Sequence, residues 1–130
     1  MAKNTTYKTR NKYGNKQLEI DNIKFDSKLE LYCYNMLKQV GLSFEFQKKI
    51  VLFEGFKYRG QAIREIALIV DFVLERKGVT YYIDTKGFAT DVSTLKYKIL
   101  KFRLKEDLYT DVVWLKNQKE VQSFIRKLIE

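Results

Sequence analysis

Asp71, Asp84 and Lys86 have the side chains of a small metal site. Carboxylate oxygens are the ligands that Mg²⁺ and Mn²⁺ prefer in proteins. A neighbouring ammonium group can hold an anion or compensate a buried carboxylate. These residues form a site only if the fold brings their side chains together, so the elements that carry them decide the question.

A β-hairpin is predicted to bring the two acids together. Two runs of alternating apolar and polar residues, 63–75 and 79–86, flank Lys77-Gly78, a dipeptide suited to a two-residue turn. Residues that face each other across this turn have numbers that sum to 155, so Asp71 falls opposite Asp84. The other, core-facing side is expected to carry Leu68, Val70, Phe72, Leu74, Val79, Tyr81 and Ile83.

Two facing carboxylates are unfavourable unless something neutralises them. At about 4 Å and an effective dielectric constant near 20, they repel each other by about 4 kcal/mol. A divalent cation would reverse this penalty, and Lys86, on the same face as Asp84, would offset part of it. The alternative is a solvated strand face with ordinary mixed charges, such as many antiparallel sheets have. From these residues alone, both interpretations stand.

Glu30 is a third acid that could join the pair. Ser27-Lys28-Leu29-Glu30 has the pattern of a capping box, in which the glutamate turns back toward the start of its own helix. Glu30 also borders the apolar stripe of the helix expected between Ser27 and Gly41, from which it could point over the sheet. A capping carboxylate cannot easily do both, so its role stays open.

The rest of the chain predicts the scaffold for these residues. We expect a strand over 44–53, a helix over 93–105 capped by Ser93, a strand over 112–115 and a last helix opened by Asn117. The apolar sides are expected to be Phe44, Phe46, Ile50 and Leu52 in the first strand and Leu95, Ile99 and Phe102 in the middle helix. The order helix, three strands, helix, strand, helix predicts an α/β domain with a mixed central sheet flanked by helices.

The composition limits the chemistry and the partners. There is no histidine and one cysteine, Cys33, which excludes histidine catalysis and histidine- or cysteine-rich zinc sites. The net charge of +9 favours a polyanionic partner, most often nucleic acid, although solubility alone could explain it. No apolar run could span a bilayer and the start is polar, so we expect no membrane partner and a cytoplasmic location. No small organic cofactor is expected either.

The first part of the chain differs from the rest. Residues 1–18 contain five basic residues and no acid, and they are expected to form a flexible basic arm. Residues 19–130 are expected to form one domain, because they contain no linker or repeat.

Taken in order, these segments resemble the PD-(D/E)xK, or restriction-endonuclease-like, nuclease core. The residues that carry the resemblance lie in 25–30, 41–46, 71–74 and 83–87, and Val70 stands where the motif has proline. The set is similar to phage-type endonuclease I, a family of junction-resolving enzymes, and to endonuclease-like proteins of phages and prophages. The similarity covers roughly residues 25–115.

This resemblance implies roles for individual residues. Asp71 and Asp84 would bind Mg²⁺ or Mn²⁺ together with the Thr85 carbonyl oxygen, and Glu30 would complete the site. Lys86 would orient the attacking water and stabilise charge on the phosphate. Lys96 matches a position where such nucleases often carry a phosphate-contacting residue. Apart from the resemblance, Lys98 and Arg64 are expected to contact nucleic acid, and so are Lys12 and Lys16, unless the basic arm is only a solvated tail.

The implied function is metal-dependent endonucleolytic cleavage of DNA, selective for branched or junction DNA, in the cytoplasm of a bacterium or a phage-infected host. Cutting both strands of a symmetric junction needs two active sites, so a homodimer is expected. The alternatives are a non-catalytic nucleic-acid-binding module and an RNA-cleaving relative. Tyr58, Tyr82 and Tyr97 could stack on unpaired bases or serve as core and surface residues. The segment 54–61 is either a substrate-binding loop or a plain hairpin.

Overall fold

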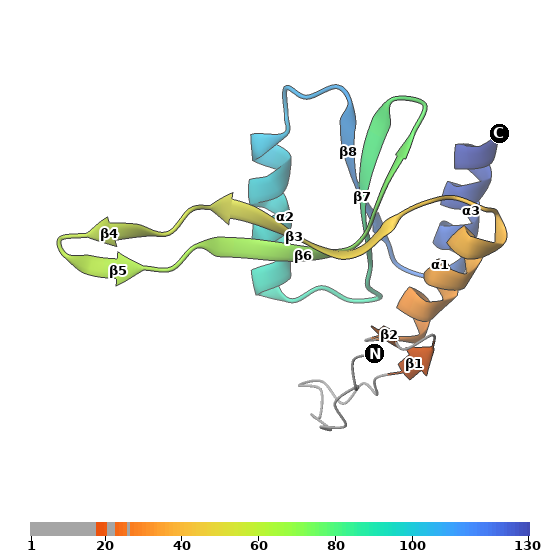
Figure 1. Cartoon of the computed structure of the whole chain (residues 1–130), viewed down its shortest axis with the longest axis horizontal. Helices are drawn as coiled ribbons and strands as arrows, with labels where there is room; N and C mark the ends of the chain where they lie inside the picture. The colour runs from red at the N-terminus through yellow and green to blue at the C-terminus, as the bar shows by residue number, and fades with distance from the viewer. Residues whose placement is uncertain (1–17, 21–22, 26) are drawn as a thin grey trace.

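A four-stranded mixed sheet forms the centre of the protein (Figure 1). The computed structural model describes residues 18–20, 23–25 and 27–130. The strand order is β3 (Glu45–Phe53), β6 (Ile66–Arg76), β7 (Val79–Thr85) and β8 (Thr110–Leu115). The first three are antiparallel, whereas β8 runs parallel to β7. The expected basic arm lies outside the described residues, except for Leu18 at the start of a short strand.

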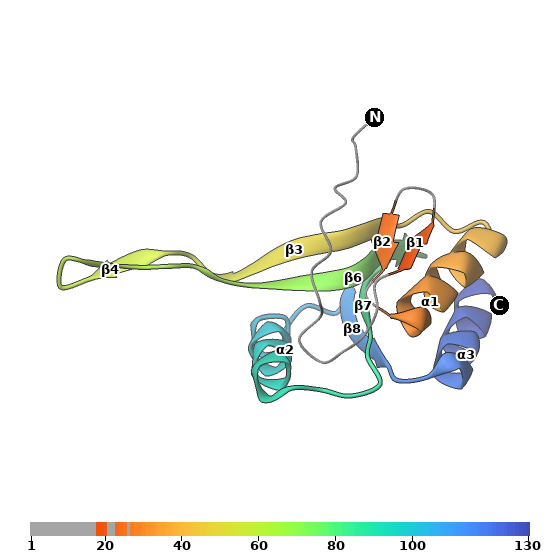
Figure 2. The same ribbon diagram turned by 90° about the horizontal axis from the view of Figure 1, so that it is seen from below.

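In the described part of the chain, three helices flank this sheet. They are α1 (Lys28–Gln39), α2 (Asp91–Arg103) and α3 (Gln118–Ile129). Figure 2 shows α1 and α3 side by side, with α2 apart from them. The core order α1-β3-β6-β7-α2-β8-α3 confirms the predicted α/β class and element order. No helix in the described ranges is long and apolar enough to cross a bilayer.

Two small hairpins add to the predicted elements. One pairs β1 (Leu18–Ile20) with β2 (Ile23–Phe25) ahead of α1. The other pairs β4 (Phe56–Tyr58) with β5 (Gln61–Ile63) and continues the direction of β3 and β6 beyond the sheet (Figure 1).

The β6–β7 hairpin has the predicted turn and register. Lys77 and Gly78 both have positive φ, 54° and 83°, as a type I′ turn requires. The paired residues keep the sum of 155 from the turn to Phe72 and Ile83, where the ladder ends. Asp71 and Asp84 therefore occupy the first opposed positions beyond the ladder.

The prediction of one continuous core face on this hairpin is wrong. Phe72 and Ile83 pack with α1 and α3 on one side of the sheet. Leu68 and Val70 pack with residues of α2 on the other side. Residues two apart normally share a face, so the inward side of β6 changes at Asp71.

In the edge strand β3, the side of the sheet on which apolar residues are buried also changes, at a position next to Asp71. Phe44, just before β3, and Phe46 belong to the α1–α3 side, whereas Ile50 and Leu52 belong to the α2 side, against the prediction of one shared face. The change coincides with Gln47, whose left-handed backbone (φ 58°) interrupts regular strand geometry. The neighbouring pairs of β3 with β6 place Gln47 opposite Asp71. Asp71 thus lies where the chain passes between the two core layers.

Helix α2 begins earlier than predicted, and a different face of it packs against the sheet. Its N-cap is Thr90, and Ser93 is the partner in a reciprocal capping box rather than the cap itself. Tyr97 and Leu100 are its buried residues. Of the expected stripe, Leu95 and Phe102 are 58% and 68% exposed. Turning Tyr97 inward places its ring against Trp114 of β8 and its hydroxyl near the acidic pair.

Candidate functional site

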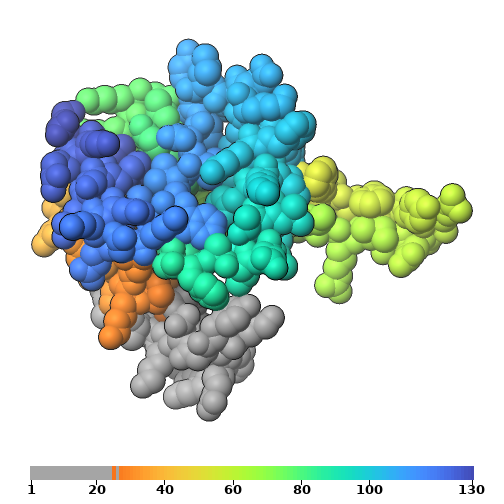
Figure 3. Space-filling model, turned by 180° about the vertical axis from the view of Figure 1, so that it is seen from behind, coloured from red at the N-terminus to blue at the C-terminus, as the bar shows by residue number. Residues whose placement is uncertain are grey.

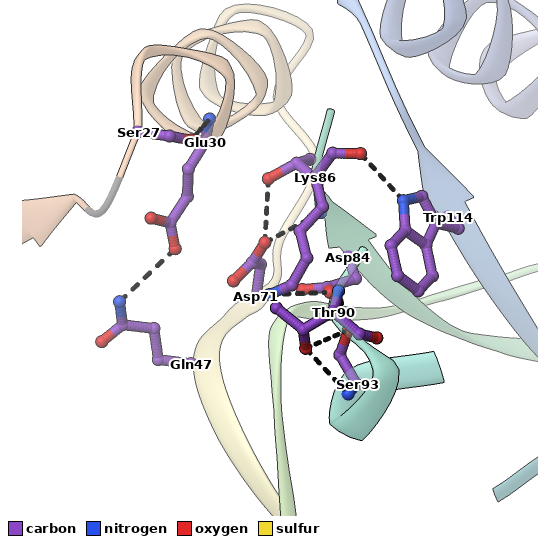
Figure 4. A network of polar contacts seen from close by, with 10 residues as sticks. Ser27, Glu30, Gln47, Asp71, Asp84, Lys86, Thr90, Ser93 and Trp114 are labelled. Carbon is purple, nitrogen blue, oxygen red and sulfur yellow. Dashed lines mark hydrogen bonds and ion pairs between the residues drawn. The ribbon is translucent and has the colours of Figure 1, made fainter. Parts of the chain in front are cut away.

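Asp71 and Asp84 lie next to each other where β6 and β7 separate, as Figure 4 shows. Asp71 is held in place by the end of the neighbouring strand β7, because its Oδ2 atom accepts hydrogen bonds from both the backbone N–H and the hydroxyl of Thr85, each 2.8 Å long. The hairpin register therefore brings the two acids together, and Thr85 fixes the orientation of one of them.

Asp84 is a buried carboxylate without hydrogen bonds. Its side chain is 1% exposed, and among the described residues neither of its carboxylate oxygens has a hydrogen-bond partner. The ammonium group of Lys86 lies 3.5 Å from Oδ2 and forms an ion pair with it. A buried ionised carboxylate costs several kcal/mol, on the order of the penalties known for buried charges, unless it is paired or coordinates a cation.

The local charges act strongly on the neighbouring groups. Burial, followed by the Asp84 and Glu30 carboxylates, raises the pKa of Asp71 well above its ordinary value of 3.8, whereas the Thr85 N–H lowers it. Burial and the Asp84 carboxylate also raise the pKa of the Tyr97 hydroxyl. Neighbouring carboxylates that raise the pKa of Asp71 in this way form a site that favours an added positive charge.

The backbone of Lys86 is anchored on both sides to β8. Its N–H donates to the Leu115 carbonyl oxygen (3.1 Å), and its carbonyl oxygen accepts from the indole Nε1 of Trp114 (2.8 Å). The side chain, 40% exposed, extends from this fixed backbone past Asp84 toward solvent. The ammonium group is therefore positioned to meet a ligand.

Glu30 lies in the same pocket but apart from the aspartate pair. Ser27 caps α1 by accepting a hydrogen bond from the Glu30 N–H. The Glu30 carboxylate accepts a hydrogen bond from Nε2 of Gln47 (3.4 Å) (Figure 4). It is 1% exposed and still raises the pKa of Asp71. Burial also raises the pKa of the nearby Cys33 thiol to about 12, so this cysteine stays protonated and is no nucleophile.

A pocket opens in front of Asp71 and is bordered by cations. It is lined by the start of α1, the ends of β7 and β8, and the start of α2. Lys28, Lys86 and Lys116 line it together with Glu30 and Asp71. Because β7 and β8 are parallel, their carboxyl ends meet at one edge of the sheet, which is why Lys86 and Lys116 come together. An acidic floor with a basic rim suits a metal ion and a bound phosphate.

The predicted nucleic-acid contacts are spread more widely than this pocket. Lys96 lines a neighbouring groove that shares Thr90 and Ser93 with the pocket. Lys98 lines a different groove, beside Phe102, and Arg64 is exposed near the β4–β5 hairpin. Lys12 and Lys16 lie outside the described residues.

The three tyrosines considered for base stacking, Tyr58, Tyr82 and Tyr97, differ in how far they are exposed. Tyr97 is buried, so it is not available for stacking on bases. Tyr82 is partly buried against the α2-side core and lines a shallow pocket on the surface. Tyr58 is 55% exposed and remains available.

Sequence reasoning missed several residues that shape the site. Gln47 and Trp114 contact it from β3 and β8, and Lys28 and Lys116 border it. The one available signal was Lys116, a basic residue directly after the strand expected over 112–115. Gln47 and Trp114 reach the site through the pairing of β3 with β6 and of β8 with β7. These strands are far apart along the chain, and the local sequence pattern does not define which strands pair.

The residues present fit a divalent cation with two carboxylate ligands. Asp71 and Asp84 offer hard oxygen atoms. Among the described residues the Asp84 oxygens accept no hydrogen bond, and a single ion pair to the partly exposed Lys86 is their one polar contact, so this carboxylate has room for a further positive charge. Within the part of the chain that the structure describes, no three acidic or cysteine side chains converge closely enough to hold a metal ion. Backbone carbonyl groups, water and a substrate phosphate would therefore have to complete the coordination, as is common for Mg²⁺.

Replacing Asp71 with asparagine should stabilise the metal-free protein. The raised pKa of Asp71 means that its contribution to stability is present below the ordinary value of 3.8 and is lost as pH rises through the folded-state pKa. In EDTA, the wild type should therefore lose stability toward neutral pH, and Asp71→Asn should melt about 5 °C higher there. Thermal melts between acidic and neutral pH check this, with exposed Asp111→Asn as control. Parallel pH profiles for wild type and Asp71→Asn would contradict it.

Comparison with known proteins adds a family but no activity. The family described as a protein of unknown function (DUF1064) matches residues 10–123, a range that includes every residue of the pocket. No match was found among curated proteins or among solved structures.

Proposed function

The chain belongs to the DUF1064 family of unknown function, and we propose that it is a divalent-metal-dependent endonuclease that hydrolyses DNA phosphodiester bonds. The observation that carries this proposal is the buried Asp84 carboxylate. Within the described part of the chain it accepts no hydrogen bond, its one ion pair is with Lys86, and it lies beside Asp71 (Figure 4) next to a pocket bordered by lysines. A cation resolves the repulsion between the acids, and the lysines supply contacts for the phosphate backbone.

Each group has a defined task in this reaction. Asp71 and Asp84 would hold Mg²⁺ or Mn²⁺, with the Thr85 carbonyl oxygen as a further ligand. When bound, the cation would stabilise charge on the phosphate and make a nearby water more acidic. Lys86 would donate to the phosphate or to the attacking water, because its ammonium group lies at the border between the acids and the pocket. Lys28 and Lys116 would hold neighbouring phosphates.

The chemistry is a single displacement at phosphorus. A bond forms between the water oxygen and phosphorus, and the bond between phosphorus and the 3′ oxygen breaks. The water loses a proton and the leaving oxygen gains one, giving a 5′-phosphate and a 3′-hydroxyl. The proposal includes action on branched DNA by a homodimer, in the cytoplasm of a bacterium or a phage-infected host.

Cleavage of defined substrates tests this proposal. The wild type is incubated with end-labelled four-way junction, nicked duplex and linear duplex DNA in Mg²⁺, Mn²⁺ or EDTA. We expect cleavage only with metal, and at least about tenfold faster on the junction. DNA binding without cleavage in any divalent metal would support the non-catalytic binding module, and faster cleavage of matched RNA would support the RNA-cleaving relative. A monomer by light scattering on junction DNA would exclude paired cuts by a dimer.

A further inference from the structure

The β4–β5 hairpin, together with its neck, forms an arm (residues 54–65) that stands clear of the domain. Figures 1 and 3 show it projecting beyond the sheet, with its tip far from the helices. All of its residues are exposed except the partly covered Ile63. An isolated two-stranded hairpin is marginally stable in water, so the arm adds nothing to the core that would explain its presence.

The exposed side chains of the arm are aromatic and cationic. Phe56 and Tyr58 are each 55% exposed, and their spacing in β4 places them on one face of the ribbon. The Arg59 guanidinium lies over the Tyr58 ring, 5.2 Å from its centroid. Residues 56–64 contain three cations, Lys57, Arg59 and Arg64, and no acid. This stretch therefore complements a polyanion with exposed planar groups.

The sequence supports the extended shape of the arm at both ends. At the tip, Arg59 and Gly60 have positive φ, 49° and 83°, as in a two-residue type I′ turn. At the neck, a Cβ atom on Gly55 would come within 3.2 Å of the Ile63 carbonyl oxygen, a tight contact, so glycine lets the two strands approach closely without adjustment. An ion pair between Lys49 and Glu65 ties the base of the arm to β3. The arm is thus a built element and not a loose loop.

A groove beside the acidic pocket leads toward the base of the arm, where Lys49 pairs with Glu65. It is lined by Lys49 at the base of the arm and by Lys96 of α2, and it shares Thr90 and Ser93 with the pocket. A nucleic acid strand seated at Asp71 can follow these lysines toward the arm. The same substrate could therefore occupy the site and the arm together.

We propose that the arm binds branched DNA by stacking Phe56 and Tyr58 on unpaired bases while its cations hold the flanking phosphates. Base–aromatic stacking requires bases that are free of their partners, as at a junction or fork. A two-stranded ribbon can also enter a duplex major groove, but the exposed rings on one face favour stacking over reading base edges. This inference rests on the proposed function for its choice of DNA, and it assigns the structure selectivity to the arm.

The test measures binding without cleavage, in EDTA. Fluorescein-labelled four-way junction, forked duplex and linear duplex DNA are titrated with the full-length wild type and with Phe56→Ala/Tyr58→Ala. The matched control is Leu108→Ala/Tyr109→Ala, which removes two side chains that are 84% and 69% exposed outside the arm. We expect the Kd of the arm variant to rise about tenfold or more on forked and junction DNA and less than about twofold on linear duplex, with the control unchanged.

A fluorescent base reports the stacking itself. 2-Aminopurine placed at the branch point should be quenched by the wild type and by the control, and not by the arm variant. An equal loss of affinity on linear and branched DNA, or no loss on either, would overturn the inference, the second outcome pointing to a protein partner instead. Thermal melts should be the same for all three proteins, because the arm lies outside both core clusters.

The outcomes separate the arm from the active site. If no DNA is cleaved in any metal while the arm variant loses branched-DNA affinity, the nuclease proposal fails and the arm inference stands. If metal-dependent cleavage occurs while the arm variant binds and quenches like the wild type, the arm inference fails and the nuclease proposal stands.

Discussion

Replacing Asp84 with asparagine should lower the rate of Mg²⁺-dependent DNA cleavage by about 10³-fold or more. A cation that stabilises charge on a phosphate contributes several kcal/mol, and each 1.36 kcal/mol is about a factor of ten in rate. The amide keeps the shape of the carboxylate but loses the negative charge that would bind the cation.

The measurement should separate metal binding from folding and from DNA binding. Single-turnover cleavage of a junction is followed across a range of Mg²⁺ concentrations, and the rise in melting temperature on adding Mn²⁺ reports metal binding. Asp84→Asn should lose both responses while binding junction DNA in EDTA as well as the wild type. Asp111→Asn, an exposed acid on neighbouring β8, should behave like the wild type. Cleavage by Asp84→Asn within about tenfold of the wild-type rate would remove Asp84 from the site.

The register of the acidic hairpin could be predicted from the sequence because it depends on local features. A two-residue turn fixes the pairing of every residue after it, and Lys77-Gly78 has the positive φ angles that such a turn needs. Alternation then decides which side chains share a face. The meeting of Asp71 and Asp84 follows from these two rules, which need no information from the rest of the chain.

Local alternation failed where tertiary structure changes the direction of a strand. Leu68 and Phe72 have the same parity, yet they pack on opposite sides of the sheet, because the chain changes face at Asp71 and at the left-handed Gln47. Nothing in the apolar pattern marks this change. The same change frees Asp71 from both core layers and leaves its carboxylate facing a pocket, so the departure from regular alternation lies at the candidate site itself.

The orientation of α2 and the projection of the arm could not be predicted from the sequence, for different reasons. Helix α2 has apolar residues on more than one side, so its periodicity could not decide whether Leu95 or Tyr97 faces the sheet. Only the pairing with Trp114 settles that choice. The segment 54–61 has the glycines of a turn in either interpretation, and its projection from the sheet depends on β3 and β6 extending beyond their neighbours.

Lys86 should prove essential for cleavage but not for metal binding. Its ammonium group lies 3.5 Å from Asp84 Oδ2, and its side chain is 40% exposed to the pocket. Lys86→Met keeps the aliphatic stem and removes the charge. Because a cation repels another cation, this variant should bind Mn²⁺ as tightly as the wild type or more tightly. Because the phosphate and the attacking water lose their donor, the single-turnover rate at saturating metal should fall by about 10²-fold.

Lys116→Met is the matched control for this variant, since Lys116 lines the same pocket from the end of β8 and does not form an ion pair with Asp84. It should weaken DNA binding modestly and reduce the saturated rate by less than about threefold. If Lys86 served only to neutralise the buried acid, Lys86→Met would recover the full wild-type rate once metal is saturating. That outcome would assign Lys86 to stability. If the rate stays low at saturating metal while metal affinity is retained, Lys86 acts on the reacting phosphate. Only a group that acts on the substrate lowers the saturated rate without lowering metal affinity.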